Sequence, residues 1–497
     1  MTANLIHTLY GTRDGASEAL RFANGPVRTT DQVRRAVGQM ARALKGAGVT
    51  AGDRVSFRLE KCEEVLLLAH ACFQVGAIIH PLNTSYTDTE IAYLVADAAP
   101  ALLVCHSADA PRLAAATGAR VATLDPGLGG TLGRQAAAAD PLGEVHPATA
   151  GTTAAILYTS GTTGKPKGAC ITHGNLAESA RALAQVWALG PQDRLLHALP
   201  MYHAHGLLTA VNSLLVAGGS VLFLERFEAA EVLAALPQAS VIMGVPTHYA
   251  RLLKEPGLGA ACTRLRLAIS GSAPLSAEIA ERFRAATGRT IIERYGATET
   301  AIVTAIPAGT EDRAGFVGWP LPGVEIRVRT EDGTCAARGA TGGLETRGHN
   351  VVPGYWRRPD ADAGAFTPDG WFVTGDIAEI DADGYVRLLG RSKDLIITGG
   401  LNVYPKEVED ALDALLDGGE SAVFGVPHPD FGEAVVAAVE HRPGLDETGL
   451  QQALRAQLAP YKIPKRILPV AAIPRNRMGK VLKAELRDTH RELFHRT

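Results

Sequence analysis

Several features that would mark a special class of protein are missing from this 497-residue sequence. The formal net charge is −3, so there is no basic excess to attract nucleic acid or an anionic membrane. The six cysteines include no CxxC pair and no metal-ligand spacing, which favours a reducing compartment. No secretory signal pattern opens the chain, and no apolar stretch reaches the ~20 residues of a membrane span. We therefore expect a soluble cytoplasmic enzyme that binds neither nucleic acid nor membrane.

The order of the hydrophobic patterns indicates an α/β fold. Strand and helix patterns alternate over most of the chain, as in the strand predicted at 53–59 and the helix predicted at 63–74. Later in the chain, short strands and turn signals crowd together and indicate a β-rich region. We expect a large N-terminal domain with mostly parallel sheets at 1–391, including a β-rich subdomain at about 315–391, and a small mobile α+β domain at 392–497.

Other elements follow from the same patterns. Residues 114–152 are dominated by Ala and Gly and give no clear pattern. Further elements are predicted as a helix at 88–98, a helix beginning at 405, and strands at 77–82, 101–105, 220–224, 240–245 and 421–426.

The segment AAILYTSGTTGKPKGA, residues 154–169, combines a buried strand with glycines, hydroxyls and lysines. Glycines let a backbone turn its N–H groups toward one point, and the hydroxyls and lysines add donors and positive charge. The segment is not a Walker A loop, because only two residues separate Gly161 from Gly164 and Pro166 stands where Walker A needs Ser or Thr. A flexible surface loop is the alternative, but two lysines and four hydroxyls after a buried strand favour a polyphosphate cradle.

This segment resembles the phosphate loop of the adenylate-forming superfamily, which includes acyl-CoA synthetases, nonribosomal adenylation domains and firefly-type luciferases. Further motifs match that family in its order: SGSAPL at 270–275, ERYGATET at 293–300, TGD at 374–376, GRSKD at 390–394 and PRNRMGK at 474–480. The resemblance implies an enzyme that adenylates a carboxylic acid with ATP and Mg²⁺ and passes the acyl group to a thiol, that of coenzyme A.

The resemblance also implies roles for individual residues. Asp376 would accept the ribose hydroxyls, Glu299 and Thr159 would hold Mg²⁺, and Lys480 would act catalytically with Thr298. The residues expected at the nucleotide are Thr159, Ser160, Gly161, Thr162, Thr163, Gly164, Lys165, Lys167, Gly271, Ser272, Ala273, Glu293, Arg294, Tyr295, Gly296, Thr298, Asp376 and Arg391.

A second set of residues is expected to serve the transfer to the thiol. Attack of the acid's carboxylate on the α-phosphate of ATP gives an acyl-adenylate, and a thiolate then attacks the acyl carbon. In the family this second step follows rotation of the small domain about a hinge, here Lys393, which withdraws Lys480. Gly399, Gly400 and Leu401 would then line the path of the thiol. The surroundings of Lys480 also resemble sites of reversible lysine acetylation, so Lys480 is a candidate for acetyltransferase and deacetylase regulation.

Two segments bear on the identity of the acid. In GVPTHYARLLK a buried strand ends at Val245, Thr247 is expected to cap a helix, and Arg251 follows one turn later on the same face. Arginine is a natural fork for a second carboxylate, although a single arginine on a helix is more often a solvated charge. The segment PMYHAHGL adds His203 and His205, which alone are more typical of structural histidines.

Together with SGSAPL, ERYGATET and ITGGLNVYPKE, these segments resemble the malonyl-CoA synthetases in particular. The resemblance implies that Arg251 grips the distal carboxylate of malonate, helped by Ser270, His203 and His205, with His203 also near the reacting groups. Ala297 stands where many members carry Met, so methylmalonate stays open as a slightly larger acid.

Three alternatives to a malonate–CoA ligase remain. The acid could instead be oxalate, an acetate-like acid or an aryl acid such as coumarate. The chain could be a stand-alone adenylation enzyme that loads a carrier protein, although no phosphopantetheine serine motif is visible. A nucleotide-binding protein without catalysis is disfavoured because Lys480, Asp376 and Glu299 are all present. The oligomeric state and the contacts to the nucleotide tail of CoA stay open.

Overall fold

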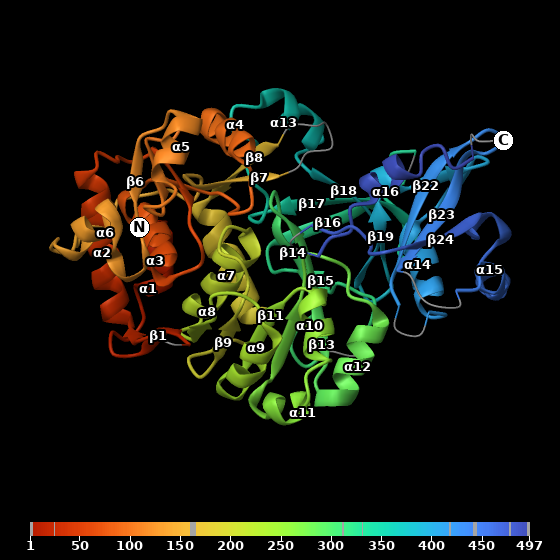
Figure 1. Cartoon of the computed structure of the whole chain (residues 1–497), viewed down its shortest axis with the longest axis horizontal. Coiled ribbons are helices and arrows are strands. Elements are labelled where there is room, and N and C mark those ends of the chain that lie inside the picture. The colour runs from red at the N-terminus through yellow and green to blue at the C-terminus, as the bar shows by residue number, and fades with distance from the viewer. Residues whose placement is uncertain are drawn as a thin grey trace.

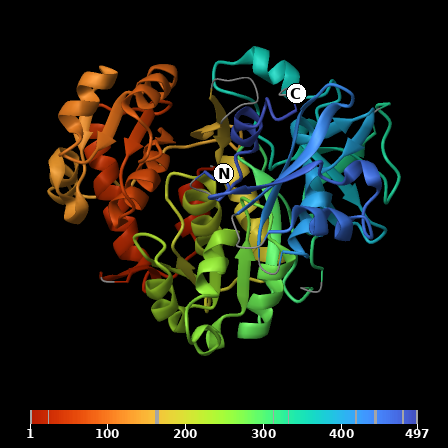
Figure 2. The same cartoon turned by 45° about the vertical axis from the view of Figure 1, so that its right-hand side comes forward.

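The computed structural model describes residues 3–23, 25–159, 166–310, 313–330, 332–416, 419–440, 445–476 and 479–494. The predicted α/β class is confirmed: two mostly parallel sheets are followed by an antiparallel β-rich subdomain and a small α+β domain (Figure 1). The small domain, in blue, lies beside the β-rich subdomain, in teal (Figure 2). No helix in the described ranges is both long and apolar enough to cross a membrane.

A six-stranded sheet carries the strand that leads into the phosphate loop. Its order is β6-β5-β3-β4-β7-β8, in which β6 to β7 run parallel and β8 is antiparallel to β7. The bounds are β3 Arg54–Arg58, β4 Ile78–Pro81, β5 Leu102–Cys105, β6 Val121–Thr123, β7 Thr153–Thr159 and β8 Lys167–Thr172. Residues 160–165, the centre of the predicted cradle, lie outside the described residues.

A nine-stranded sheet gathers most of the other motifs at one edge. Its order is β15-β14-β13-β12-β11-β9-β10-β1-β2, and the run from β13 to β1 is parallel. Parallel strands end at the same edge of a sheet, where α/β proteins bind their ligands. The bounds are β1 Glu18–Phe22, β2 Val27–Thr29, β9 Arg194–His197, β10 Ser220–Phe223, β11 Val241–Gly244, β12 Leu267–Ser270, β13 Ile291–Ala297, β14 Ala301–Ala305 and β15 Trp319–Pro320.

Helices connect these strands, as parallel neighbours require. Their bounds are α1 Leu5–Tyr10, α2 Thr30–Gly46, α3 Glu63–Val75, α4 Asp88–Ala98, α5 Ala110–Thr117, α6 Gly130–Ala137, α7 His173–Val186, α8 Val211–Val216, α9 Ala229–Ala235, α10 Pro246–Leu252, α11 Leu258–Ala261 and α12 Ala277–Thr287.

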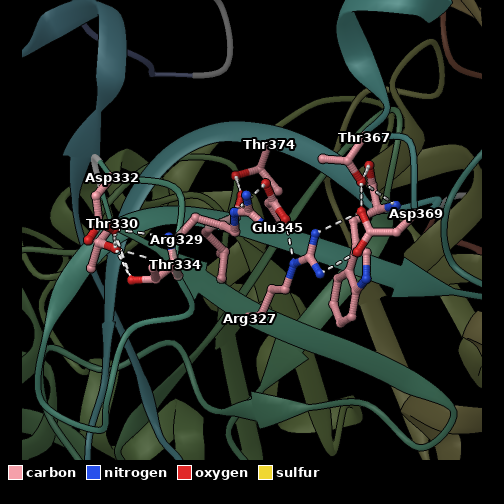
Figure 3. Close-up of polar contacts among 11 residues, drawn as sticks. Arg327, Arg329, Thr330, Asp332, Thr334, Glu345, Thr367, Asp369 and Thr374 are labelled. Atoms are coloured by element: carbon pink, nitrogen blue, oxygen red, sulfur yellow. Dashed lines mark hydrogen bonds and ion pairs between the residues drawn. The ribbon is translucent and has the colours of Figure 1, made fainter.

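The β-rich subdomain is an antiparallel sheet in the order β16-β17-β18-β19, with α13 at Pro359–Ala365. A polar network stiffens it (Figure 3): Arg327 pairs with Glu345 and, over 2.6 Å, with Asp369. Thr374 donates to the carbonyl of Leu344 and accepts from the amide of Asp376, which fixes the backbone of β18. The bounds are β16 Val324–Arg329, β17 Thr341–Gly348, β18 Phe372–Ile380 and β19 Val386–Arg391.

The small domain has a hydrophobic core of its own, which includes Val408, Val423 and Val435. Its sheet has the order β21-β20-β23-β22, with β24 parallel to β23, and α14 packs against β19. The bounds are β20 Ile396–Thr398, β21 Leu401–Val403, β22 Ser421–His428, β23 Gly432–Glu440, β24 Arg466–Val470, α14 Pro405–Asp413, α15 Glu447–Leu454 and α16 Lys483–Thr489.

Candidate active site

Arg294 is a buried cation at the carboxyl edge of the nine-stranded sheet. Arg294 is the middle residue of β13. Its side chain packs on Gly271, where an added Cβ would stand 2.5 Å from the Arg294 Nε. The residue is 7% exposed, and its Nε and Nη2 have no hydrogen-bond partner in the described chain. Burial lowers the pKa of Arg294 to about 10, so the guanidinium stays charged at neutral pH. A charged group with unused donors is thus aimed away from protein acceptors.

His205 lies beside this cation, and His203 lies near His205. His205 belongs to a π-helix at Ala204–Ala210, a conformation that is frequent at functional sites. Its Nδ1 lies 3.2 Å from the hydroxyl of Ser272, and its Nε2 has no partner within the described ranges. Burial, and then Arg294, hold the pKa of His205 well below its ordinary value, and burial lowers the pKa of His203 to about 4. Both histidines are therefore neutral hydrogen-bonding groups at neutral pH.

Two further groups complete this side of the site. Ser270, the last residue of β12, is fully buried, and its hydroxyl has no partner in the described part of the chain. Ser272 has a left-handed φ of +72°, a strained conformation for a side-chain-bearing residue that is found mostly at functional sites. The structure thus brings Ser272, His205 and Arg294 together. The motifs that contain them, SGSAPL, PMYHAHGL and ERYGATET, are separate in the sequence and did not indicate this contact.

Arg251 lies on α10 with an exposed side chain and forms no ion pair with the described residues. The predicted cap at Thr247 is wrong: α10 begins at Pro246, its N-cap is Val245, and no side chain caps it. Proline fits the first helical position, so the helix starts one residue before Thr247. The methyl group of Thr247 instead faces the loop of the small domain, 3.2 Å from the position of a Cβ on Gly479.

Glu299 joins the phosphate-loop strand to the ERYGATET motif. Thr159 donates to its Oε1 over 2.9 Å, and Tyr355 donates to the same oxygen over 3.1 Å. The ammonium of Lys167 lies 5.4 Å from the centre of the Tyr355 ring. The structure therefore brings together the two residues expected to hold magnesium. The carboxylate and hydroxyl oxygens are the hard ligands that Mg²⁺ prefers, so these residues fit it.

Gly296, three residues before Glu299, lies where β13 is crowded by the neighbouring strand β14. A Cβ on Gly296 would stand 1.9 Å from the carbonyl oxygen of Ala301, so the Tyr-Gly sequence is required by close backbone approach. Ala297 ends β13 and donates from its amide to the hydroxyl of Thr300, and Thr298 opens the turn that follows.

Asp376 is the centre of a second cluster, which spans the β-rich subdomain and the small domain. It is 5% exposed, its Oδ1 lies 2.7 Å from the Arg391 Nε, and Tyr295 donates its hydroxyl to Oδ2. Lys480 of the small domain reaches the same cluster with an exposed side chain. Partial burial, then Arg391 and Lys393, hold the pKa of Lys480 below its ordinary value, and Asp376 opposes them. The lysine thus stands within electrostatic reach of the expected ribose site.

Glu293 lies where the small domain approaches β13. The amide of Leu275 donates to it over 3.3 Å. Burial raises its pKa to about 7, against the opposing charge of Lys406 on α14. Ala273 lies in the same loop as Leu275 and, like Gly271 and Ser272, is a residue of SGSAPL expected at the nucleotide.

The residues expected to serve the thiol step lie at the start of the small domain. Lys393 is in a single turn at Ser392–Asp394 directly after β19, and Arg487 of α16 donates to its carbonyl and pairs with Asp394 over 2.7 Å. Gly399 and Gly400 have φ of +58° and +79° and form the two-residue turn between β20 and β21, a conformation that suits glycine. Leu401 beside them is 48% exposed.

Two mostly parallel sheets, a β-rich subdomain and a small domain whose Lys480 approaches Asp376 together form the architecture of the adenylate-forming enzymes. The family model for AMP-binding enzyme matches residues 12–356, and that for the AMP-binding enzyme C-terminal domain matches residues 407–480. The chain belongs to the AMP-binding enzyme family.

Individual relatives narrow the class. The ATP-bound crystal structure of MatB from Rhodopseudomonas palustris is 43% identical with a TM-score of 0.96, covering 99% of this chain and 100% of that one. Its apo structure gives a TM-score of 0.87 at the same identity and coverage. The mitochondrial malonate–CoA ligase of Mus musculus is 36% identical over 87% of this chain and 81% of its own. Feruloyl-CoA synthase of Amycolatopsis is 34% identical over 93% and 94%. This chain is an AMP-forming acid–CoA ligase, whose co-substrates are ATP and coenzyme A.

Proposed function

We propose that this ligase acts on malonate, forming malonyl-AMP and then malonyl-CoA. The observation that carries the proposal is the buried Arg294, whose Nε and Nη2 lack partners in the described chain. A buried charge is costly unless an opposite charge completes it. A dicarboxylate supplies that charge, because one carboxylate reacts while the other remains ionised. The similarity to a malonate–CoA ligase supports this choice of acid.

We therefore propose that Arg294, which was expected at the nucleotide, belongs to the acid pocket. Arg251 would bind the distal carboxylate together with it, and Ser270, His203 and His205 would contribute hydrogen bonds. Because both histidines are neutral at neutral pH, the positive charge comes from the arginines. The small side chain of Ala297 supports tolerance of a methyl branch, and so of methylmalonate.

The second cluster would hold ATP. Asp376 would accept the ribose hydroxyls, Tyr295 would lie against adenine with the loop at Gly271–Ala273, and Thr298 and the phosphate loop would bind the phosphates. Glu299 and Thr159 would hold Mg²⁺, which when bound neutralises charge on the phosphates. The hydrogen bond from Tyr295 to Asp376 and the ion pair of Asp376 with Arg391 support this division of the site.

The first half-reaction needs positioning and charge neutralisation. A carboxylate oxygen of malonate bonds to the α-phosphorus of ATP as the bond to pyrophosphate breaks, and the ammonium of Lys480 would stabilise the negative charge between them. In the second half-reaction the thiolate of CoA bonds to the acyl carbon, the bond to AMP breaks, and AMP leaves.

We place the hinge at Lys393, next to the border between the large domain at 1–391 and the small domain at 392–497, and propose that rotation there separates the two half-reactions. Lys480 would withdraw and the Gly399–Gly400 turn would line the thiol's path. The TM-score is higher against the ATP-bound relative than against the apo relative, which supports two arrangements of this fold; the present structure is more similar to the ATP-bound one.

An acid panel tests the proposal. AMP formation with CoA present is measured for malonate, methylmalonate, oxalate, acetate, coumarate and longer acids, and malonate is expected to have the highest kcat/KM. Arg251→Ala should lower that value for malonate by roughly 10²-fold and leave acetate unchanged. Arg42→Ala, an exposed arginine on α2, is the control. Preference of the wild type for a monocarboxylate, or malonate turnover unaffected by Arg251→Ala, would contradict the proposal. Replacing CoA with carrier proteins tests the acceptor.

A further inference from the structure

Lys61 ties the two parallel sheets together at the edge where the acid pocket lies. It belongs to the segment between β3 and α3 of the six-stranded sheet, yet its Nζ lies 2.7 Å from Nδ1 and 2.8 Å from the carbonyl oxygen of His197, the last residue of β9. The same Nζ lies 5.4 Å from the centre of the Phe223 ring, at the end of β10. The lysine therefore ends at the carboxyl edge of the nine-stranded sheet.

The hydrogen bonds of His197 leave Lys61 with an unused donor. Nε2 of His197 lies 3.0 Å from the carbonyl oxygen of Gly206, which can only accept, so Nε2 carries the proton. Nδ1 is then an acceptor, and Lys61 donates one N–H to it and another to the His197 carbonyl. An ammonium has three N–H groups, and the described chain supplies an acceptor for two of them.

The charge of Lys61 reaches the helix that carries Arg251. His248, one turn before Arg251 on α10, has its pKa lowered to about 3 by burial and then by the charges of Arg251 and Lys61. His205 is similarly affected by burial, Arg294, His197 and His248. The three cations thus act on one connected group of buried histidines.

No carboxylate offsets these cations. Within the described ranges none of Lys61, Arg251 and Arg294 takes part in an ion pair. Burial holds the pKa of Lys61 well below its ordinary value, and an anion in the pocket would raise that pKa by stabilising the ammonium. A mere tie between two sheets needs only a hydrogen-bond donor, and a neutral side chain would serve at a lower cost of desolvation.

We infer that Lys61 is a further specificity-determining residue, whose positive charge acts with Arg251 and Arg294 to select acids that carry a second anionic group. The inference rests on the proposed function, because it concerns the same pocket. Its distinguishing claim is that the charge of Lys61, and not its hydrogen bond to His197, determines the choice of acid.

Three substitutions separate charge from hydrogen bonding. Lys61→Gln keeps a donor toward His197 without charge, Lys61→Met removes both, and Lys61→Arg keeps both. The ratio of kcat/KM for malonate to that for acetate is expected to fall by roughly tenfold or more in Lys61→Gln and Lys61→Met, mainly through the KM for malonate. Lys61→Arg should retain most of the ratio. Lys45→Gln, an exposed lysine of α2, controls for loss of charge elsewhere, and thermal unfolding monitors folding.

The outcomes are distinct. A wild type that prefers acetate overturns the proposed function before any variant is made. A wild type that prefers malonate, with the ratio kept in Lys61→Gln, overturns only the role of Lys61. If the Gln and Met variants fail to fold, Lys61→Arg decides: a folded Arg variant that loses the ratio overturns selection by charge.

Discussion

The guanidinium of Arg294 packs directly on Gly271, and a Cβ added to Gly271 would stand 2.5 Å from its Nε. Real Cβ atoms do not approach other atoms so closely, so the guanidinium would have to shift. The two residues lie 23 positions apart and meet because β12 and β13 are neighbours in the sheet. Gly271 is thus a condition for the position of the buried cation.

Gly271→Ala is expected to displace Arg294 and to raise the KM for malonate by roughly tenfold or more, with little change in the KM for ATP. Steady-state kinetics with each substrate varied in turn measures both. Gly46→Ala, where nothing lies within 4 Å of the added Cβ, is the matched control. An unchanged malonate KM in a folded Gly271→Ala protein would show that Arg294 does not contact the acid.

Asp376→Asn should affect the other end of the site. A carboxylate can accept two hydroxyl donors at once while pairing with Arg391, whereas an amide offers one acceptor oxygen. We expect the KM for ATP to rise by roughly tenfold to 10²-fold and the KM for malonate to change little. Asp369→Asn, which perturbs an exposed pair with Arg327 in the same subdomain, is the control. Equal losses for both substrates would argue for general disruption.

Local sequence signals predicted some elements closely. The helix expected at 88–98 is α4, whose start is fixed by a capping box between Thr87 and Glu90. The helix at 63–74 ends one residue later than predicted, before Gly76 with its left-handed φ of +77°. Residues 114–152 gave no signal because Ala and Gly leave no hydrophobic periodicity, yet they include α6 and β6.

The contacts around the proposed acid pocket could not be predicted in the same way. Ser270 and Arg251 were identified as candidates through the resemblance of their segments to a family, and the sequence could not indicate that Arg294 packs on Gly271. Lys61 and His197 are 136 positions apart and meet only because the segment after β3 lies against the end of β9. The sequence did contain one signal for Arg294. It lies inside the strand IIERYGA, and an arginine is almost never buried in a strand unless it is paired with another group.

Glu293 should make stability depend on pH. Its folded pKa of about 7 lies above the ordinary value of 4.5, chiefly through burial. The folded protein therefore holds the proton longer, so stability is full below about pH 4.5, falls between about 4.5 and 7, and is level above. The fall is at most about 3 kcal/mol. Glu293→Gln should flatten it in melting curves recorded across this range, and Lys406→Met, which removes the opposing cation, should shift it upward. Identical profiles for wild type and Glu293→Gln would refute the assignment.

Lys393→Pro tests rotation at the proposed hinge. Proline fixes φ near −65°, so a residue that must change its backbone dihedrals during rotation can no longer do so. Exchange of pyrophosphate into ATP should stay within about threefold of wild type, while thioester formation should fall by roughly 10²-fold or more. Lys393→Ala is the control for loss of the side chain. If Lys393→Pro slows both half-reactions equally, the two steps share one domain arrangement.

Acetylation of Lys480 is expected to stop adenylation and spare the thiol step. The side chain is exposed, so a modifying enzyme can reach it, and its ammonium lies in the field of Asp376, Arg391 and Lys393. Acetylation removes the charge that would neutralise the α-phosphate, so pyrophosphate exchange should fall by roughly 10²-fold or more. Protein acetylated only at Lys480 should still convert supplied malonyl-AMP and CoA to malonyl-CoA, because the proposed rotation would withdraw this lysine before that step. Acetylation at Lys483, which pairs with Glu409 over 2.6 Å within the small domain, is the matched control. Undiminished exchange by the Lys480-acetylated protein would mean that another cation stabilises the adenylating transition state, and equal loss of both half-reactions would mean that Lys480 stays in the site throughout.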